Sequence, residues 1–172
     1  MRILVVGMGL IGGSICKSIK AATSHAVYGC DVQQAVLDDA IADGAIDGTG
    51  TMTDGTYDMI ILCLHQRIAI QMVQEALPKI PAGTILVDTC GLKGRMVRDL
   101  TYRCRKADVR YVGTHPMAGR EKNGYYASIP NLFQNANQWT APMKRLWTPS
   151  RNWQTRWASA RSSPPRPCGT IT

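Results

Sequence analysis

Long apolar runs are absent from this 172-residue sequence, and their absence limits the classes of protein that it can encode. No apolar run approaches the roughly 20 residues needed to cross a bilayer. At the N-terminus, Arg2 precedes only four apolar residues before Gly7, which is too short a run for a secretory signal. With 45% hydrophobic and 19% charged residues, the composition is that of a soluble globular protein. We therefore expect a cytoplasmic protein that does not bind membranes.

Paired cysteine motifs are also missing. The six cysteines form no C-x-x-C pair and no zinc-type spacing with histidine. Cys16, Cys30 and Cys63 lie in apolar stretches, which favours small, reduced core residues over a disulfide framework. We expect no metal site, and this use of cysteine fits the cytoplasm.

Acidic residues are missing from the C-terminal part, where none follows Glu121. Residues 139–172 carry six Lys or Arg and all four tryptophans, without helical or strand periodicity, whereas residues 1–138 carry 14 Lys or Arg against 12 Asp or Glu. The net charge of +8 therefore belongs mainly to the end of the chain and gives little support for nucleic-acid binding. We predict a domain over residues 1–137 and a poorly ordered basic tail over residues 138–172, for which a frameshift is the economical explanation. The alternative is a functional basic-aromatic tail that binds RNA or a membrane surface.

The first twelve residues contain the most informative motif that is present. Residues 1–6 are mainly apolar and lead directly into G-x-G-x-x-G, which is followed by a helical pattern. A strand, a glycine turn and a helix in this order are typical of a dinucleotide-binding site, because the glycines permit the tight turn, the approach of a pyrophosphate and the packing of helix on strand. The helix N-terminus offers free N–H groups to phosphate. The residues expected to bind the cofactor are Gly7, Gly9, Leu10, Ile11 and Gly12.

Asp31 indicates which dinucleotide is bound. It follows a second apolar run at residues 26–30 and lies 22 residues after Gly9. An acidic side chain at about this distance holds the adenosine ribose through its 2′-hydroxyl. It would repel a 2′-phosphate, and no Arg occurs within residues 32–34, so we predict NAD rather than NADP. The alternative is a glycine-rich turn that binds no ligand.

Short apolar runs alternate with helical patterns along the rest of the domain. Strands are expected at residues 26–30, 59–64, 84–88 and 110–113, and helices at residues 33–42, 68–77 and 97–106. This alternation predicts an α/β fold with a doubly wound, mostly parallel sheet of the Rossmann type. Ligands bind such sheets beyond the carboxyl ends of the strands, where His65, residues 88–93 and His115 fall.

Residues 113–124, GTHPMAGREKNG, resemble the G-x-H-P-M-A-G-x-E-x-x-G signature of prephenate dehydrogenases. Residues 9–14 and residues 88–93 resemble the same family, so that the resemblance covers residues 1–137. It implies the oxidative decarboxylation of prephenate to 4-hydroxyphenylpyruvate with NAD⁺, on the route to tyrosine. Full-length members are homodimers with a second, helical domain, and nothing in residues 138–172 matches that domain.

The resemblance also implies roles for individual residues. His115 matches the catalytic histidine, which accepts the proton of the ring hydroxyl, and a neutral imidazole is well suited to that task near pH 7. Lys93 and Glu121 match residues of the substrate site: the lysine supports the anionic substrate or its loop, and the glutamate gates the pocket. Gly91 stands where some members have a serine that could orient the histidine.

Two other interpretations stay open at this point. The chain could be an NAD-binding fragment without catalytic activity, or it could act on arogenate, which differs from prephenate by an amine.

Overall fold

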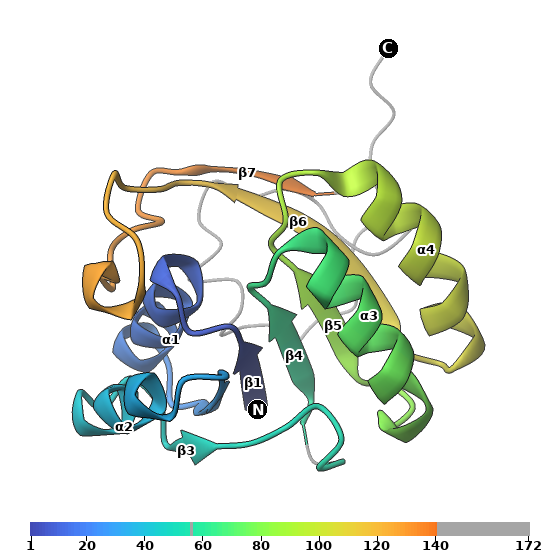
Figure 1. The fold of residues 1–172 in the computed structure, drawn as a ribbon, viewed down its shortest axis with the longest axis horizontal. Helices are drawn as coiled ribbons and strands as arrows, with labels where there is room; N and C mark the ends of the chain where they lie inside the picture. Colours follow the sequence, from blue (N-terminus) through green and yellow to red (C-terminus); the bar gives the residue numbers. More distant parts are fainter. Residues whose placement is uncertain (56, 141–172) are drawn as a thin grey trace.

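The computed structural model describes residues 1–55 and 57–140, whose strands form one seven-stranded sheet (Figure 1). The strands are β1 (Arg2–Val6), β2 (Ala26–Cys30), β3 (Gly48–Thr49), β4 (Met59–Leu62), β5 (Ile85–Asp88), β6 (Arg110–Met117) and β7 (Asn137–Thr140). Their order is β3-β2-β1-β4-β5-β6-β7, and only the pairing of β7 with β6 is antiparallel among these strands. The order 3-2-1-4-5-6 is that of dinucleotide-binding folds, so the predicted Rossmann-type sheet is confirmed.

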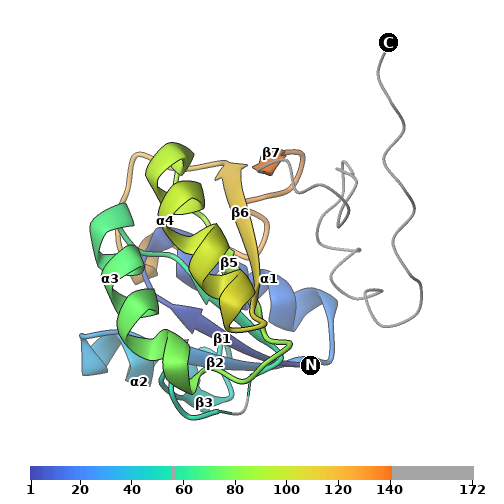
Figure 2. The same ribbon diagram turned by 90° about the vertical axis from the view of Figure 1, so that its right-hand side faces the viewer.

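Four helices cover the two faces of the sheet. They are α1 (Leu10–Ala22), α2 (Gln34–Ala42), α3 (Gln66–Ala76) and α4 (Lys93–Lys106), with short 3₁₀ turns at η1 (Leu77–Lys79) and η2 (Tyr125–Ala127). Helices α1 and α2 lie on one face, and α3 and α4 lie on the other (Figures 1 and 2). Among the described residues, no helix has the length and apolar character required to span a membrane.

The alternation of side chains along the central strands explains this layering. In β1, Leu4 and Val6 pack with residues of α3 and α4, whereas Ile3 and Val5 pack with residues of α1 and α2. Successive side chains of a strand point to opposite faces, so a strand covered on both sides must be apolar at every position. Each fully buried Val, Leu or Ile contributes about 1.5–3 kcal/mol to folding.

The parallel strands end in register along one edge. Cys30, Val6, Leu62, Asp88 and Gly113 pair in a row across β2, β1, β4, β5 and β6. The residues that follow this row form the carboxyl edge of the sheet, where a ligand would bind.

The structure differs most from the predicted elements at β6, α4 and β3. Strand β6 runs on to Met117, so His115 lies within a strand, because β7 pairs with residues 114–117 beyond the last parallel pair. Helix α4 begins at Lys93 rather than at Val97. Residues 48 and 49 are not among the expected strands and form β3, which is too short for a periodicity to reveal.

The predicted boundary after residue 137 falls within strand β7. Strand β7 includes residues 138–140, the first three of the segment expected as a tail. Residues 141–172, on which the rest of that prediction falls, lie outside the described residues.

Candidate cofactor and catalytic site

The glycine turn between β1 and α1 is tightly packed at two of its three glycines. Gly7 has a φ of +92°, and a Cβ there would lie 2.6 Å from the carbonyl oxygen of Cys63. A Cβ at Gly12 would overlap the carbonyl oxygen of Gly7. The protein's own packing therefore requires glycine at both positions.

Gly9 is different, because no described atom lies within 4 Å of the position that its Cβ would take. Its φ of −74° suits any residue, and it is the N-cap of α1, whose first turn has no side-chain cap. Neither packing nor backbone conformation requires a glycine here. The open space and the free N–H groups of Leu10 and Ile11 fit a bound pyrophosphate.

Asp31 lies directly beside this turn. Its Oδ2 accepts a hydrogen bond from the N–H of Met8 at 2.7 Å, and its Oδ1 accepts one from the N–H of Gln33 at 3.0 Å. The carboxylate therefore joins the end of β2 to the glycine turn. Each oxygen keeps a lone pair for a ribose hydroxyl.

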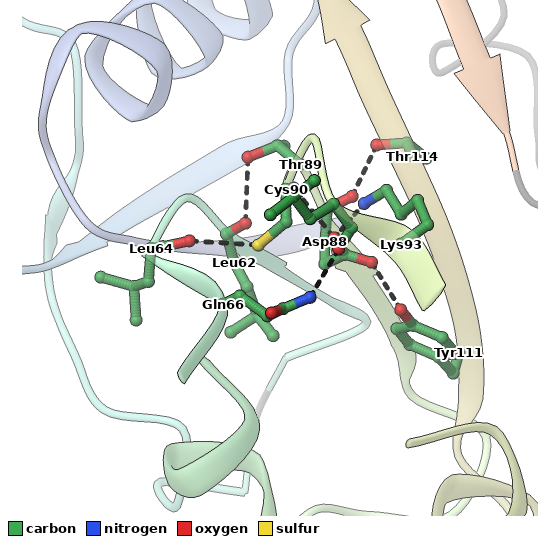
Figure 3. A network of polar contacts seen from close by, with 10 residues as sticks. Leu62, Leu64, Gln66, Asp88, Thr89, Cys90, Lys93, Tyr111 and Thr114 are labelled. Atoms are coloured by element: carbon green, nitrogen blue, oxygen red, sulfur yellow. Dashed lines mark hydrogen bonds and ion pairs between the residues drawn. The ribbon is translucent and has the colours of Figure 1, made fainter. Parts of the chain in front are cut away.

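Side chains link the segments that follow β4 and β5 at the carboxyl edge, as Figure 3 shows. Three of them donate hydrogen bonds to main-chain oxygens of the other segment, so the edge is tied together before any ligand binds. The bonds run from Thr89 Oγ1 to Leu62 O (3.1 Å), from Cys90 Sγ to Leu64 O (3.2 Å) and from Gln66 Nε2 to Leu92 O (2.7 Å).

Asp88, the last residue of β5, is fully buried at the centre of a polar cluster (Figure 3). Its Oδ1 accepts hydrogen bonds from the N–H of Cys90 at 2.9 Å and from the ammonium of Lys93. Its Oδ2 accepts the hydroxyl of Tyr111 at 2.6 Å, and its carbonyl oxygen accepts the hydroxyl of Thr114 at 2.7 Å. The acid thus connects the segment after β5 with two positions on β6.

Lys93 is one of the predicted substrate residues, and its ammonium pairs with Asp88 inside the protein. The residue is only 9% exposed. Burial lowers the pKa of the Lys93 ammonium, and the neighbouring carboxylate of Asp88 opposes that shift. Burial also raises the pKa of Tyr111, with Asp88 adding to the effect, so its hydroxyl stays a hydrogen-bond donor.

Sequence reasoning named neither Asp88 nor Tyr111 as a site residue. The sequence feature that could have identified Asp88 is an acid at the end of an otherwise apolar strand, with a lysine five residues later. Such a charge in a buried strand needs a partner, and Lys93 was near enough to be suspected. Tyr111 lies 23 residues from Asp88, and nothing local connects the two.

His115 lies two residues beyond the row of strand ends, on the part of β6 that pairs with β7. Its side chain is half-buried. A Cβ at Gly91 would lie 3.4 Å from both Cε1 and Nε2 of the ring, so the segment after β5 passes beside the imidazole. The structure therefore brings together Gly91 and His115.

Contacts connect the glycine turn to His115 along the same edge. Gly7 lies beside Cys63 and Leu64, the carbonyl of Leu64 accepts the thiol of Cys90, and the next residue, Gly91, lies beside the ring. Strands β1 and β6 are three strand spacings apart, which corresponds to about 14 Å. A dinucleotide laid across the sheet edge from the glycine turn would run toward His115.

Glu121 is not brought into this cluster. It is exposed in the loop after β6, and it makes no hydrogen bond or ion pair with any described residue. The loop is anchored on α1 further along the chain, where Ser14 Oγ accepts the N–H of Ile129 at 3.0 Å and Ser18 donates to the carbonyl of Pro130 at 2.6 Å.

The cysteines at this edge do not suggest thiolate chemistry. Burial raises the pKa of Cys63 to about 12 and that of Cys90 to about 11, so both are thiols at neutral pH. Within residues 1–55 and 57–140, no three His, Cys, Asp or Glu side chains gather where they could hold a metal ion.

Known proteins resemble the chain over most of its length. The family described as "Prephenate dehydrogenase, nucleotide-binding domain" matches residues 15–149. The prephenate dehydrogenase of Lactococcus lactis subsp. cremoris (strain MG1363) is 32% identical over 139 residues, which cover 78% of this chain and 39% of that protein. The chain spans 37–46% of the length of the curated relatives that it matches.

Solved structures show the same likeness. The crystal structure of prephenate dehydrogenase from A. aeolicus in complex with hydroxyphenyl propionate and NAD⁺ has a TM-score of 0.77 and 26% identity, covering 94% of this chain and 55% of that one. The crystal structure of Synechocystis arogenate dehydrogenase has a TM-score of 0.74 and 25% identity, with the same coverage.

Proposed function

The chain belongs to the prephenate dehydrogenase family, whose nucleotide-binding domain it contains, and from this premise we propose that it binds NAD⁺ along the carboxyl edge of its sheet. Gly7, Gly9 and Gly12 with the N-terminus of α1 hold the pyrophosphate, and Asp31 holds the adenosine ribose. Support comes from the space at Gly9, which the packing of the described residues leaves open and which a pyrophosphate would use.

We further propose that His115 is the general base in the oxidative decarboxylation of prephenate to 4-hydroxyphenylpyruvate. A ring nitrogen of His115 accepts the proton of the substrate's ring hydroxyl as the carbon that bears it is oxidised. NAD⁺, when bound, supplies the hydride acceptor. Loss of the ring carboxylate as CO₂ leaves its bonding electrons in the ring, which becomes aromatic, so the step is irreversible.

Lys93, which precedes His115 in the sequence, and Glu121, which follows it, complete the proposed substrate site. Lys93 supports the loop that follows β5, since its ammonium already pairs with Asp88. Glu121 has a free carboxylate on an exposed loop among the described residues, which suits a group that closes the pocket by pairing with a cation.

The observation that carries this function is the position of the His115 imidazole beside Gly91, at the edge of the sheet that also holds the glycine turn. The test is NADH formation from prephenate and NAD⁺, with the parent chain and His115→Asn compared. We expect the substitution to lower the rate by about 10²–10⁴. Equal turnover by the two chains would remove His115 from the chemistry.

Two alternatives have support of their own. The likeness to an arogenate dehydrogenase favours arogenate as a second substrate, and the same assay with arogenate compares the two. The second alternative is NAD⁺ binding without turnover, since the part of the family that the chain matches is its nucleotide-binding domain. Binding of NADH measured by its fluorescence, together with no turnover of either substrate, would identify that case.

A further inference from the structure

The buried cluster around Asp88 has no part in the chemistry proposed above, yet it lies beside the proposed base. We propose that Asp88 is a positioning residue for His115: it fixes residues 89–93 against β6 and so holds Gly91 against the imidazole. The inference rests on the proposed function only in calling His115 the base. The arrangement itself follows from the contacts.

On one side, Asp88 determines the path of the segment after β5. Its Oδ1 accepts the N–H of Cys90 and the ammonium of Lys93, which are the residues on either side of Gly91 and Leu92. The short segment between these two contacts has little freedom to move. Gly91, which lies beside the ring, is within this segment.

On the other side, Asp88 binds β6 at two positions, both of which precede His115 in the strand. Its Oδ2 accepts the hydroxyl of Tyr111, and its carbonyl oxygen accepts the hydroxyl of Thr114, the residue next to His115. One fully buried residue therefore contacts both the segment after β5 and strand β6, which carries His115 (Figure 3).

Lys93 is in an unusual place for a lysine. It is the first residue of α4, where the helix dipole disfavours a cation, and it is almost completely buried. Neither helix formation nor solubility explains a lysine there. Pairing with Asp88 does, because a buried ammonium requires a hydrogen-bonded counter-ion.

A buried ion pair is a poor means of adding stability but a good means of selecting one arrangement. Apolar residues could fill the same space, and they would leave the segment free to settle in several ways. Here the acceptors of Asp88 face donors in fixed directions, so the position of Gly91 is specified. Lys93 acts on this segment through its pair with Asp88.

The test is the ring spectrum of histidine in the intact chain. The sequence has three histidines, so His25 and His65 serve as internal references for His115 in one ¹H–¹⁵N spectrum. We expect Asp88→Asn, which leaves Lys93 without its counter-ion, to shift the His115 signals and leave those of His25 in place. As a matched control, Asp47→Asn removes a carboxylate that also accepts a lysine and a main-chain N–H, and it should leave His115 unchanged.

Tyr111→Phe keeps both charges and removes one hydrogen bond to Asp88, so it provides a second variant if Asp88→Asn does not fold. It should shift the His115 signals in the same direction as Asp88→Asn, by less. Unchanged His115 signals in a folded variant, or equal shifts at all three histidines, would overturn the inference.

NADH binding measured on the same samples separates this inference from the proposed function. We expect the variants to bind within about threefold of the parent, because the partners of Asp88 include neither the glycine turn nor Asp31, which hold the pyrophosphate and the adenosine ribose. A parent chain that binds no NADH refutes the proposed function and leaves the histidine spectrum to decide the role of Asp88.

Discussion

Gly91 lies beside the imidazole of His115, so that a Cβ added at this glycine would lie 3.4 Å from both Cε1 and Nε2 of the ring. That spacing is ordinary van der Waals contact, so a small side chain at residue 91 fits without displacing the ring. Gly91 is not among the glycines with positive φ, so a side chain causes no backbone strain. Neither packing nor backbone strain therefore requires a glycine at residue 91, and the absence of a side chain there determines which groups lie beside the imidazole.

A hydroxyl at residue 91 should reach the imidazole. We expect Gly91→Ser to form a hydrogen bond to a ring nitrogen of His115, and the ¹⁵N signals of the ring should show it. Gly91→Ala is the matched control, because it adds the same Cβ without the hydroxyl. The free energies of unfolding of both variants should lie within about 1 kcal/mol of that of the parent. Identical ring spectra for the serine and alanine variants would show that no such bond forms.

At the glycine turn, the effect of a substitution on stability can be distinguished from its effect on NADH binding. We expect Gly9→Ala to change the free energy of unfolding by less than about 1 kcal/mol, because its Cβ meets no described atom. It should weaken NADH binding by at least about tenfold, because a methyl group then occupies the space proposed for the pyrophosphate. Fluorescence titration and thermal unfolding, with and without NADH, measure both effects.

Gly12→Ala and Gly94→Ala complete that comparison. A Cβ at Gly12 overlaps the backbone of Gly7, so this variant should lose about 1–3 kcal/mol or more of stability. A Cβ at Gly94, on α4, meets no described atom, and its variant should bind NADH like the parent. If Gly9→Ala binds NADH as tightly as Gly94→Ala does, the pyrophosphate does not lie at Gly9.

Local patterns predicted the elements that depend on neighbouring residues. Strand β4 was recognisable because every position is apolar, β1 because every position after Arg2 is apolar, and the glycine turn because its three glycines stand in a fixed spacing. The doubly wound parallel sheet then followed from the alternation of strands and helices. The acid after β2, Asp31, was predicted to hold the ribose, and its hydrogen bond from Met8 lies at the glycine turn.

Features that depend on distant partners could not be predicted. The extension of β6 to Met117 requires β7, about 20 residues further along the chain. The pairing of Asp88 with Tyr111 likewise joins residues on different strands. In both cases the pattern of one segment contains no information about the segment that will lie beside it.

Asp31 should control the choice of cofactor as well as the turn. Each oxygen of its carboxylate accepts a main-chain N–H, and an asparagine can accept with one oxygen only. We expect Asp31→Asn to cost about 1 kcal/mol in stability and to reduce the preference for NADH over NADPH. Fluorescence titration with both cofactors measures that preference.

Asp38→Asn is the control for this substitution. Asp38 lies on α2 and accepts a bond from the Gln34 side chain at 2.8 Å, away from the turn. Asp38→Asn should leave the affinities for NADH and NADPH unchanged. An unaltered ratio of NADH to NADPH affinity in Asp31→Asn would mean that the ribose is held elsewhere.

Asp47 should make the domain sensitive to acid. Lys20 donates to its Oδ1 at 2.6 Å and the N–H of Val27 to its Oδ2 at 2.8 Å, and these bonds hold the pKa of Asp47 below its ordinary 3.8. Since the pKa is lower in the folded chain, the unfolded chain takes up the proton first as the pH falls. The contribution of Asp47 is therefore complete above about pH 4 and is lost as the pH falls toward the folded pKa.

Urea unfolding of the parent and Asp47→Asn across this range tests that argument. We expect the difference in the free energy of unfolding to be constant near neutral pH and to shrink below about pH 4. High salt should weaken the part due to Lys20, which is partly exposed, and spare the part due to the Val27 N–H. Two curves that stay parallel from neutral to acid pH would show that Asp47 titrates alike in the folded and unfolded chains, and that its two bonds do not favour the charged form.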